Sequence, residues 1–147
     1  MRFRRKPVDA FQMATSTQIA AMVPIADDEN IPMIDGRGQG FDLLRSIDLG
    51  LGLWRSNVAT DLDRVGSRQI VVVAAYTPED IESSRPLMKR FMTIVLAMGL
   101  GPSYGSRALT LGAVGYIDAS TDEGEIRGVF SDAVARVCIR RLREAAA

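Results

Sequence analysis

The sequence contains no histidine, and this absence narrows the range of functions more than any other feature of its 147 residues. Histidine is the commonest general base, the commonest metal ligand and the side chain that titrates nearest to neutral pH. The single cysteine, Cys138, can build neither a disulfide framework nor a thiolate metal site. The sequence therefore disfavours ordinary catalysis, and we expect no enzyme activity, no catalytic residue, no cofactor and no metal.

An excess of one charge and a long apolar run are also missing. The 18 basic residues balance 18 acidic ones, whereas a dedicated nucleic-acid binder normally carries a basic excess. No apolar run approaches the roughly 18 residues that span a bilayer. Residues 1–6 are basic like the start of a signal peptide, but polar side chains interrupt the segment that follows. We therefore expect an intracellular protein with no membrane partner.

The length and composition fit one domain. A chain that is 47% hydrophobic and 24% charged has enough apolar material for a proper core at this size. No internal repeat or low-complexity tract divides it. We expect a single domain over residues 1–147, with a basic N-terminal arm at 1–7 and a C-terminal tail at 143–147.

In the first half of the chain, apolar spacing predicts one helix and two strands. Apolar residues recur every three or four positions over residues 8–23, which is typical of an amphipathic helix that ends before Pro24. Strict alternation over residues 47–53 predicts a strand with one buried face. The β-branched run at residues 70–75 predicts a central strand covered on both faces. Because a short polar stretch separates the two strands, we expect them to pair antiparallel.

A second helix is expected at residues 78–98. Thr77, Pro78 and the acids that follow form a helix start, and Leu87, Phe91, Ile94, Val95 and Met98 supply an apolar stripe. Pro86 lies inside this span. Either it kinks the helix, or Ser83 or Ser84 caps a second helical start; the pattern slightly favours the kink.

The last third of the chain favours strands. Residues 109–116 suggest a strand broken by Gly112 and Gly115, followed by an acidic turn at 118–125 and a short return strand at 126–130. Residues 133–142 fit either a helix or a strand, and their β-branched content favours the strand. The expected fold class is α+β, a small antiparallel or mixed sheet packed on one face by two helices.

Two glycine-containing segments imitate catalytic or phosphate-binding motifs. Residues 101–105 match the Gly-x-Ser-x-Gly pattern of a nucleophile elbow, but they follow a predicted helix, and the chain has no histidine to act as base. Gly36, Gly38 and Gly40 do not have the spacing of a dinucleotide-binding fingerprint. Both segments are predicted to be loops, and Arg37 would offer a contact surface within the second.

The remaining candidates are single residues and a small acidic cluster. Asp118, Ser120, Asp122 and Glu125 lack the glycine and glutamate positions of an EF-hand, which indicates an acidic turn. Asp61 and Asp63 have no partner cluster. Cys138 is predicted to be a small core or interface residue, and Trp54 a partly buried aromatic at the end of a strand, or else an interface anchor.

The order of these elements resembles that of the tail terminator proteins of long-tailed bacteriophages. These also have an N-terminal helix, a loop containing Asp-Gly, a β-hairpin, a central helix and closing strands joined by an acidic turn. The corresponding segments are residues 8–23, 34–37, 47–76, 78–98 and 109–140. The resemblance covers nearly the whole chain in element order and length, and it carries over no site residues.

The resemblance implies a structural virion protein. It would form a homo-oligomer, a hexameric ring, that caps the tail tube protein, stops its polymerisation and joins it to the head-completion or connector protein. DNA would pass through the lumen without being read, and the protein would reside in the virion neck or tail after assembly in the host cytoplasm. The alternatives are another neck stopper or tail tube subunit, or a small α+β ligand-binding or enzyme domain that works through carboxylates or arginines.

Overall fold

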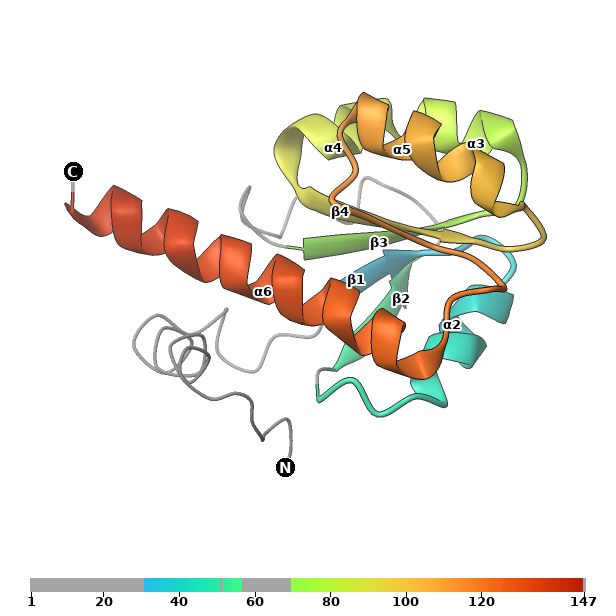
Figure 1. The fold of residues 1–147 in the computed structure, drawn as a ribbon, viewed down its shortest axis with the longest axis horizontal. Helices are drawn as coiled ribbons and strands as arrows, with labels where there is room; N and C mark the ends of the chain where they lie inside the picture. The colour runs from blue at the N-terminus through green and yellow to red at the C-terminus, as the bar shows by residue number, and fades with distance from the viewer. Residues whose placement is uncertain (1–30, 51, 57–69, 147) are drawn as a thin grey trace.

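The computed structural model of the chain describes residues 31–50, 52–56 and 70–146 (Figure 1). Strands and helices alternate along most of this sequence. The elements are β1 (Ile31–Ile34), α2 (Gln39–Arg45), β2 (Leu53–Ser56), β3 (Ile70–Ala75), α3 (Pro78–Ser83), α4 (Arg85–Arg90), β4 (Met92–Ala97), the 3-10 turn η2 (Pro102–Tyr104), α5 (Gly105–Leu111), β5 (Gly115–Ile117) and α6 (Glu123–Ala146). The predicted helix at 8–23, the arm at 1–7, Asp61 and Asp63 lie outside the described residues.

The five strands form one sheet in the order β2-β1-β3-β4-β5, and every neighbouring pair is parallel. Helices α2 and α6 cover one face of this sheet, and α3, α4 and α5 cover the other (Figure 1). The α+β prediction is therefore wrong: the chain folds as a three-layered α/β domain with helices on both faces. Parallel neighbours require crossovers between strands, and helices supply most of them here.

The hydrophobic core lies on both faces of the two central strands. All six residues of β3 and all six of β4 are buried. Ile70 and Val72 face the layer that contains α6, where Phe130 packs, whereas Val71 and Val73 face the opposite layer. The prediction of a doubly covered central strand at residues 70–75 is confirmed.

The predicted antiparallel hairpin over residues 47–76 is wrong. Strand β2 begins only at Leu53 and pairs with β1, which inserts between β2 and β3. Before it, Gly50 has a φ of +69°, a left-handed conformation that a strand cannot continue through. Ile47 and Leu49 lie in a loop, where Leu49 is buried and Ile47 packs against the same core cluster.

The predicted helix at 78–98 divides into two short helices and a strand. Its start is confirmed, because the Thr77 hydroxyl accepts a hydrogen bond from the Asp80 amide and the Asp80 carboxylate accepts one from the Thr77 amide. α3 ends at Ser83, and α4 begins at Arg85, with Pro86 in the first turn where no amide hydrogen is needed. The alternative of a second start is therefore correct, with Ser84 at the N-cap position although its side chain makes no capping hydrogen bond, and the kinked helix is wrong; residues 92–97 form β4.

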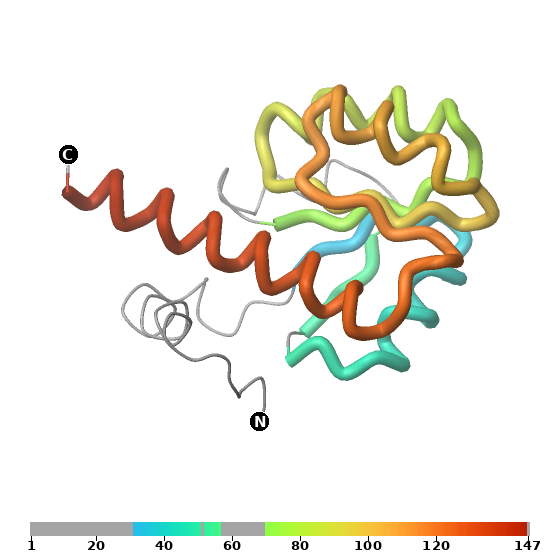
Figure 2. The backbone as a smooth tube through the Cα atoms, in the orientation of Figure 1, coloured from blue at the N-terminus to red at the C-terminus, as the bar shows by residue number. Residues whose placement is uncertain are grey.

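The predictions for the last third of the chain are also mostly wrong. Residues 105–111 form α5, only residues 115–117 are a strand, and residues 123–146 form one helix of 24 residues. This helix replaces the expected strands at 126–130 and 133–142 and extends through most of the predicted tail at 143–147. Figure 2 shows its C-terminal half projecting beyond the sheet. Within the described part of the chain, no helix is long and apolar enough to cross a bilayer.

Gly115 allows α6 to pack closely on β5. A methyl group added at Gly115 would lie 2.5 Å from Cγ1 of Val129, a β-branched side chain that a helix holds in one rotamer. We expect Gly115→Ala to lower the free energy of unfolding by about 2 kcal/mol in urea denaturation. The double variant Gly115→Ala/Val129→Ala should recover part of that loss. Gly128→Ala is the matched control, since nothing lies near its added methyl group; an equal loss there would contradict the packing argument.

Candidate functional site

The candidate site lies at the carboxyl ends of β1 and β3, at the centre of one edge of the sheet. After β1 the chain turns into α2 on one face, and after β3 it turns into α3 on the opposite face. In parallel α/β sheets this reversal of direction opens a crevice, which is where such folds commonly bind ligands. Asp35 follows β1 and Tyr76 follows β3, so these two residues face each other across the crevice.

Asp35 is completely buried, with an exposed fraction of 0%, and its carboxylate accepts four hydrogen bonds. Oδ1 accepts from the amides of Arg37 and Gly38 at 3.1 and 2.9 Å and from the Tyr76 hydroxyl at 2.7 Å. Oδ2 accepts from the Phe41 amide at 2.9 Å. The carboxylate therefore caps the first turn of α2 and also joins it to the end of β3.

The loop between β1 and α2 is fixed by a second set of contacts. Gly38 has a φ of +84°, and Arg55 of β2 donates to the carbonyls of Asp35 and Gly36 at 2.8 and 3.1 Å. The glycine-containing segment at 36–40 is therefore a loop only up to Gly38, because α2 begins at Gln39. Gly40 lies inside the helix and donates to the Tyr76 hydroxyl at 3.3 Å.

The pKa values of the two facing side chains move in opposite directions. Burial alone would raise the pKa of Asp35, but the hydrogen bonds from Tyr76, Phe41, Gly38 and Arg37 outweigh it, so its pKa lies below the usual value. The pKa of Tyr76 is raised by burial and by the hydrogen bond to the negative Asp35. At neutral pH the pair is thus an ionised carboxylate and a neutral phenol.

We expect Tyr76→Phe to raise the pKa of Asp35, because it removes a donor that favours the ionised carboxylate. A carboxyl whose folded pKa is depressed stabilises the fold above its unfolded value, about 3.9, and loses that contribution as the pH falls through the folded pKa. On acidification, the variant should therefore begin to lose stability at a higher pH than the native chain. At neutral pH its free energy of unfolding should be lower by about 1–2 kcal/mol. Carboxyl ¹³C NMR measures the pKa. Tyr104→Phe is the control, and an unchanged Asp35 pKa in Tyr76→Phe would contradict this role.

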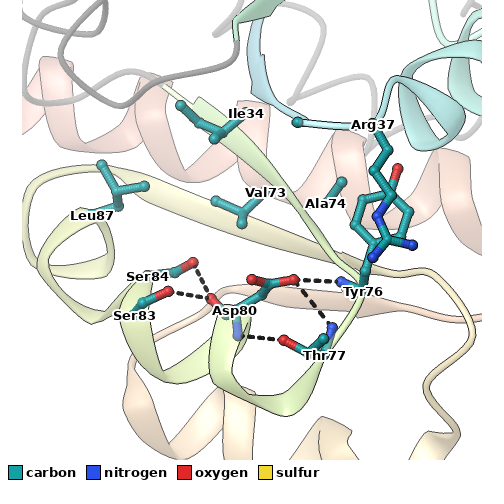
Figure 3. Close-up of a pocket in the computed structure, with 11 residues that line it drawn as sticks. Ile34, Arg37, Val73, Ala74, Tyr76, Thr77, Asp80, Ser83, Ser84 and Leu87 are labelled. Atoms are coloured by element: carbon teal, nitrogen blue, oxygen red, sulfur yellow. Dashed lines mark hydrogen bonds between the residues drawn. The ribbon is translucent and has the colours of Figure 1, made fainter.

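A cavity of about 430 Å³ opens beside Tyr76, between the sheet and α3 (Figure 3). Apolar side chains of β1, β3 and α4 line one part of it, and polar side chains from the loops and α3 line the rest. Its lining residues are Ile34, Gly36, Arg37, Val73, Ala74, Tyr76, Thr77, Asp80, Ser83, Ser84 and Leu87. The exposed guanidinium of Arg37 stacks on the Tyr76 ring, 4.6 Å from its centroid. We call this cavity the Tyr76 groove.

The motifs that imitated catalytic or metal sites do not contribute to the groove. Residues 101–105 are exposed or half-buried, and they contain the 3-10 turn η2 and the first residue of α5, so the predicted loop is only partly right. The acidic turn caps α6, because the Asp122 carboxylate accepts from the Glu125 amide at 2.8 Å and that of Glu125 accepts from the Asp122 amide at 3.0 Å. Among the described residues, no group of three or more acidic or cysteine side chains could hold a metal ion.

The prediction for Cys138 is confirmed, and that for Trp54 is right in its partial burial, although Trp54 lies inside β2 and not at a strand end. Cys138 is buried in α6, where burial raises the pKa of its thiol, and Trp54 is a half-buried aromatic of the edge strand β2. Sequence reasoning missed Asp35, Tyr76 and Asp80 as site residues. The available signal was a polar residue directly after each of two apolar runs, which becomes informative only if both runs are parallel strands.

Comparisons with known proteins bear on the fold. No family model matches the sequence, and no curated protein matches it significantly. NtrX from Brucella abortus, solved in complex with ADP, matches with a TM-score of 0.62 and 14% identity over 80% of this chain and 28% of that one. A pilus assembly-related protein from Burkholderia pseudomallei matches at 0.50 with 12% identity, over 72% of this chain and 89% of its own. An orphan response regulator of H. pylori scores 0.49 at 12% identity, with coverages of 71% and 95%.

The first two likenesses support the class of fold, a flavodoxin-like α/β fold with a parallel five-stranded sheet. They overturn the resemblance to tail terminator proteins, and with it the hexameric ring, the tail tube and connector partners and the structural virion role. The error arose because the two strands in residues 47–76 were interpreted as an antiparallel hairpin. In the sheet, β2 and β3 are instead separated by β1, and both pair with it in parallel. The chain spans only 28% of NtrX, so nothing about the rest of that protein transfers to it.

Proposed function

We propose that this chain is a receiver-like regulatory domain that acts in signalling by binding and does not accept a phosphoryl group at the carboxyl edge of its sheet. The receiver-like fold supports the signalling part of the proposal. The hydrogen bond between Asp35 and Tyr76 carries the second part, because it places a phenol against the carboxylate at the end of β1 that would otherwise be available to hold a cation.

Among the described residues, the carboxylate at the end of β1 is not available for the cation that phosphoryl transfer needs. Such reactions use a divalent cation held by carboxylates, together with cationic side chains around the phosphoryl oxygens. Asp35 is the carboxylate at the end of β1, and four donors already occupy it. A phenol, Tyr76, stands opposite it at the end of β3. The described lysine, Lys89, is exposed on α4.

The proposal predicts that the chain stays unmodified by a phosphoryl donor. Incubation with acetyl phosphate and Mg²⁺ should leave the intact mass unchanged, whereas an established response regulator treated in parallel should gain one phosphoryl group. Asp35→Asn is the matched variant. A mass gain in the native chain that disappears in Asp35→Asn would contradict the proposal, because it would show that Asp35 accepts the group.

A further inference from the structure

We propose that the Tyr76 groove binds a small zwitterion with an apolar side chain, the chemical class of a free α-amino acid. The inference rests on the proposed function, since it identifies what a binding domain of this kind would sense. Three features of the groove carry it: a cation that has no anionic partner among the described residues, a carboxylate with one oxygen to which none of them donates, and an apolar wall between these charges and α4 (Figure 3).

Arg37 supplies the positive end. Its guanidinium lies over the Tyr76 ring, and within the described part of the chain no carboxylate pairs with it. Stacking uses the flat face of a guanidinium and leaves the N–H groups at its edge free to donate. A carboxylate is the group that this edge binds best, because two parallel N–H donors match its two oxygens.

Asp80 supplies the negative end. Its Oδ2 accepts from the amides of Tyr76 and Thr77 at 2.8 and 3.1 Å, and the described residues provide no donor to its other oxygen. The carboxylate is half-buried and is held in place by the capping of α3. An ammonium group is the natural partner for the available oxygen. Tyr76 positions both charges, since its ring carries Arg37 and its amide binds Asp80.

The apolar wall selects the rest of the ligand. Ile34, Val73 and Leu87 line the groove on the side that faces α4, and its volume of about 430 Å³ falls within the range of small-molecule sites. A purely anionic ligand would face Asp80, a purely cationic ligand would face Arg37, and an uncharged apolar ligand would leave both charges unpaired. A zwitterion with an apolar side chain satisfies all three features together.

The test is an NMR titration of the full chain with L-phenylalanine. The matched probes are N-acetyl-L-phenylalanine, which lacks the ammonium, L-phenylalaninamide, which lacks the carboxylate, and glycine, which lacks the apolar side chain. We expect L-phenylalanine to shift the signals of Val73, Ala74 and Leu87, and each of the three probes to bind at least about tenfold more weakly. Equal binding of any probe, or no shift with L-phenylalanine up to about 10 mM, would overturn the inference.

Two arginine variants complete the experiment. Arg37→Gln should weaken L-phenylalanine binding by about tenfold or more. Arg45→Gln is the matched control, because Arg45 also stacks on an aromatic ring, that of Phe41 at 5.6 Å, but lies outside the groove. Equal losses in both variants, or none in Arg37→Gln, would overturn the assignment. If L-phenylalanine does not bind and the intact mass is unchanged after acetyl phosphate treatment, the inference about the ligand is wrong. The proposed function is not contradicted by that combination of results.

Discussion

Replacing Asp35 with alanine is expected to lower the free energy of unfolding by about 3–5 kcal/mol, measured by urea denaturation at neutral pH. The substitution leaves three backbone amides and the Tyr76 hydroxyl without their acceptor, and the position is completely buried. A buried donor that loses its acceptor costs more than the hydrogen bond itself contributes, because water cannot replace the partner. Asp35 thus stabilises the start of α2 and the end of β3 together.

Two further variants make this result interpretable. Asp35→Asn keeps one acceptor oxygen but replaces the other with an NH₂ group, so its loss should be about half that of alanine. Asp48→Ala is the control: Asp48 is exposed and, among the described residues, its carboxylate accepts one bond, from the Gly50 amide at 3.1 Å, so its loss should stay below about 1 kcal/mol. If Asp35→Ala costs no more than Asp48→Ala, the carboxylate does not hold the site together.

The second large effect is expected at Ala133, on the buried side of α6. Ala133→Asp should lower the free energy of unfolding by about 4 kcal/mol, because it places a charge where the exposed fraction is 1%. Ile139 is the matched position, with an exposed fraction of 39%, and Ile139→Asp should cost less than about 1 kcal/mol. Both variants are measured by the same denaturation experiment.

This pair of variants distinguishes a helix from a strand at residues 133–142. In a strand, residues 133 and 139 would share one face, and both substitutions would be severe. In a helix they point in different directions, and the buried positions recur at Ile126, Phe130, Ala133 and Val137, with spacings of four, three and four. Equal losses at Ala133 and Ile139 would contradict the helix.

Secondary structure could be predicted from the sequence where the residue types of a short segment determine its backbone conformation. The run at residues 70–75 contains β-branched side chains bounded by polar ones, and it is β3. Thr77 and Asp80 have the spacing of a capping box, and they form one. These features depend on neighbours in the sequence, so a single chain is sufficient to identify them.

Features that depend on tertiary packing were not readable. Residues 92–97 continue an apolar region after α4, and an apolar run without a clear period fits a buried strand or a helix equally well. Residues 133–142 contain β-branched side chains that favour a strand locally, but packing of α6 against the sheet overrides that preference. β1 has only four residues, too few to establish a period.

The candidate site was missed for the same reason. Asp35 and Tyr76 are 41 positions apart in the sequence, and only a parallel register of β1 and β3 brings them together. The glycines at 36–40 favoured a flexible loop and concealed the start of α2. Once the hairpin was assumed, no reasoning from local sequence could place the two side chains at one edge.

Tyr76 contacts both helical layers, and it does so through different atoms. Its hydroxyl holds Asp35 and the Gly40 amide on the side of α2, whereas its backbone amide holds Asp80 on the side of α3. Rotation of the Tyr76 side chain would therefore break the hydroxyl contacts to Asp35 and Gly40 and leave the cap of α3 in place. The ring that such a rotation moves is the one on which Arg37 rests. Tyr76 thus links the two helical layers, and a change in its side-chain torsion angle would alter contacts on the α2 side without disturbing the backbone contact on the α3 side.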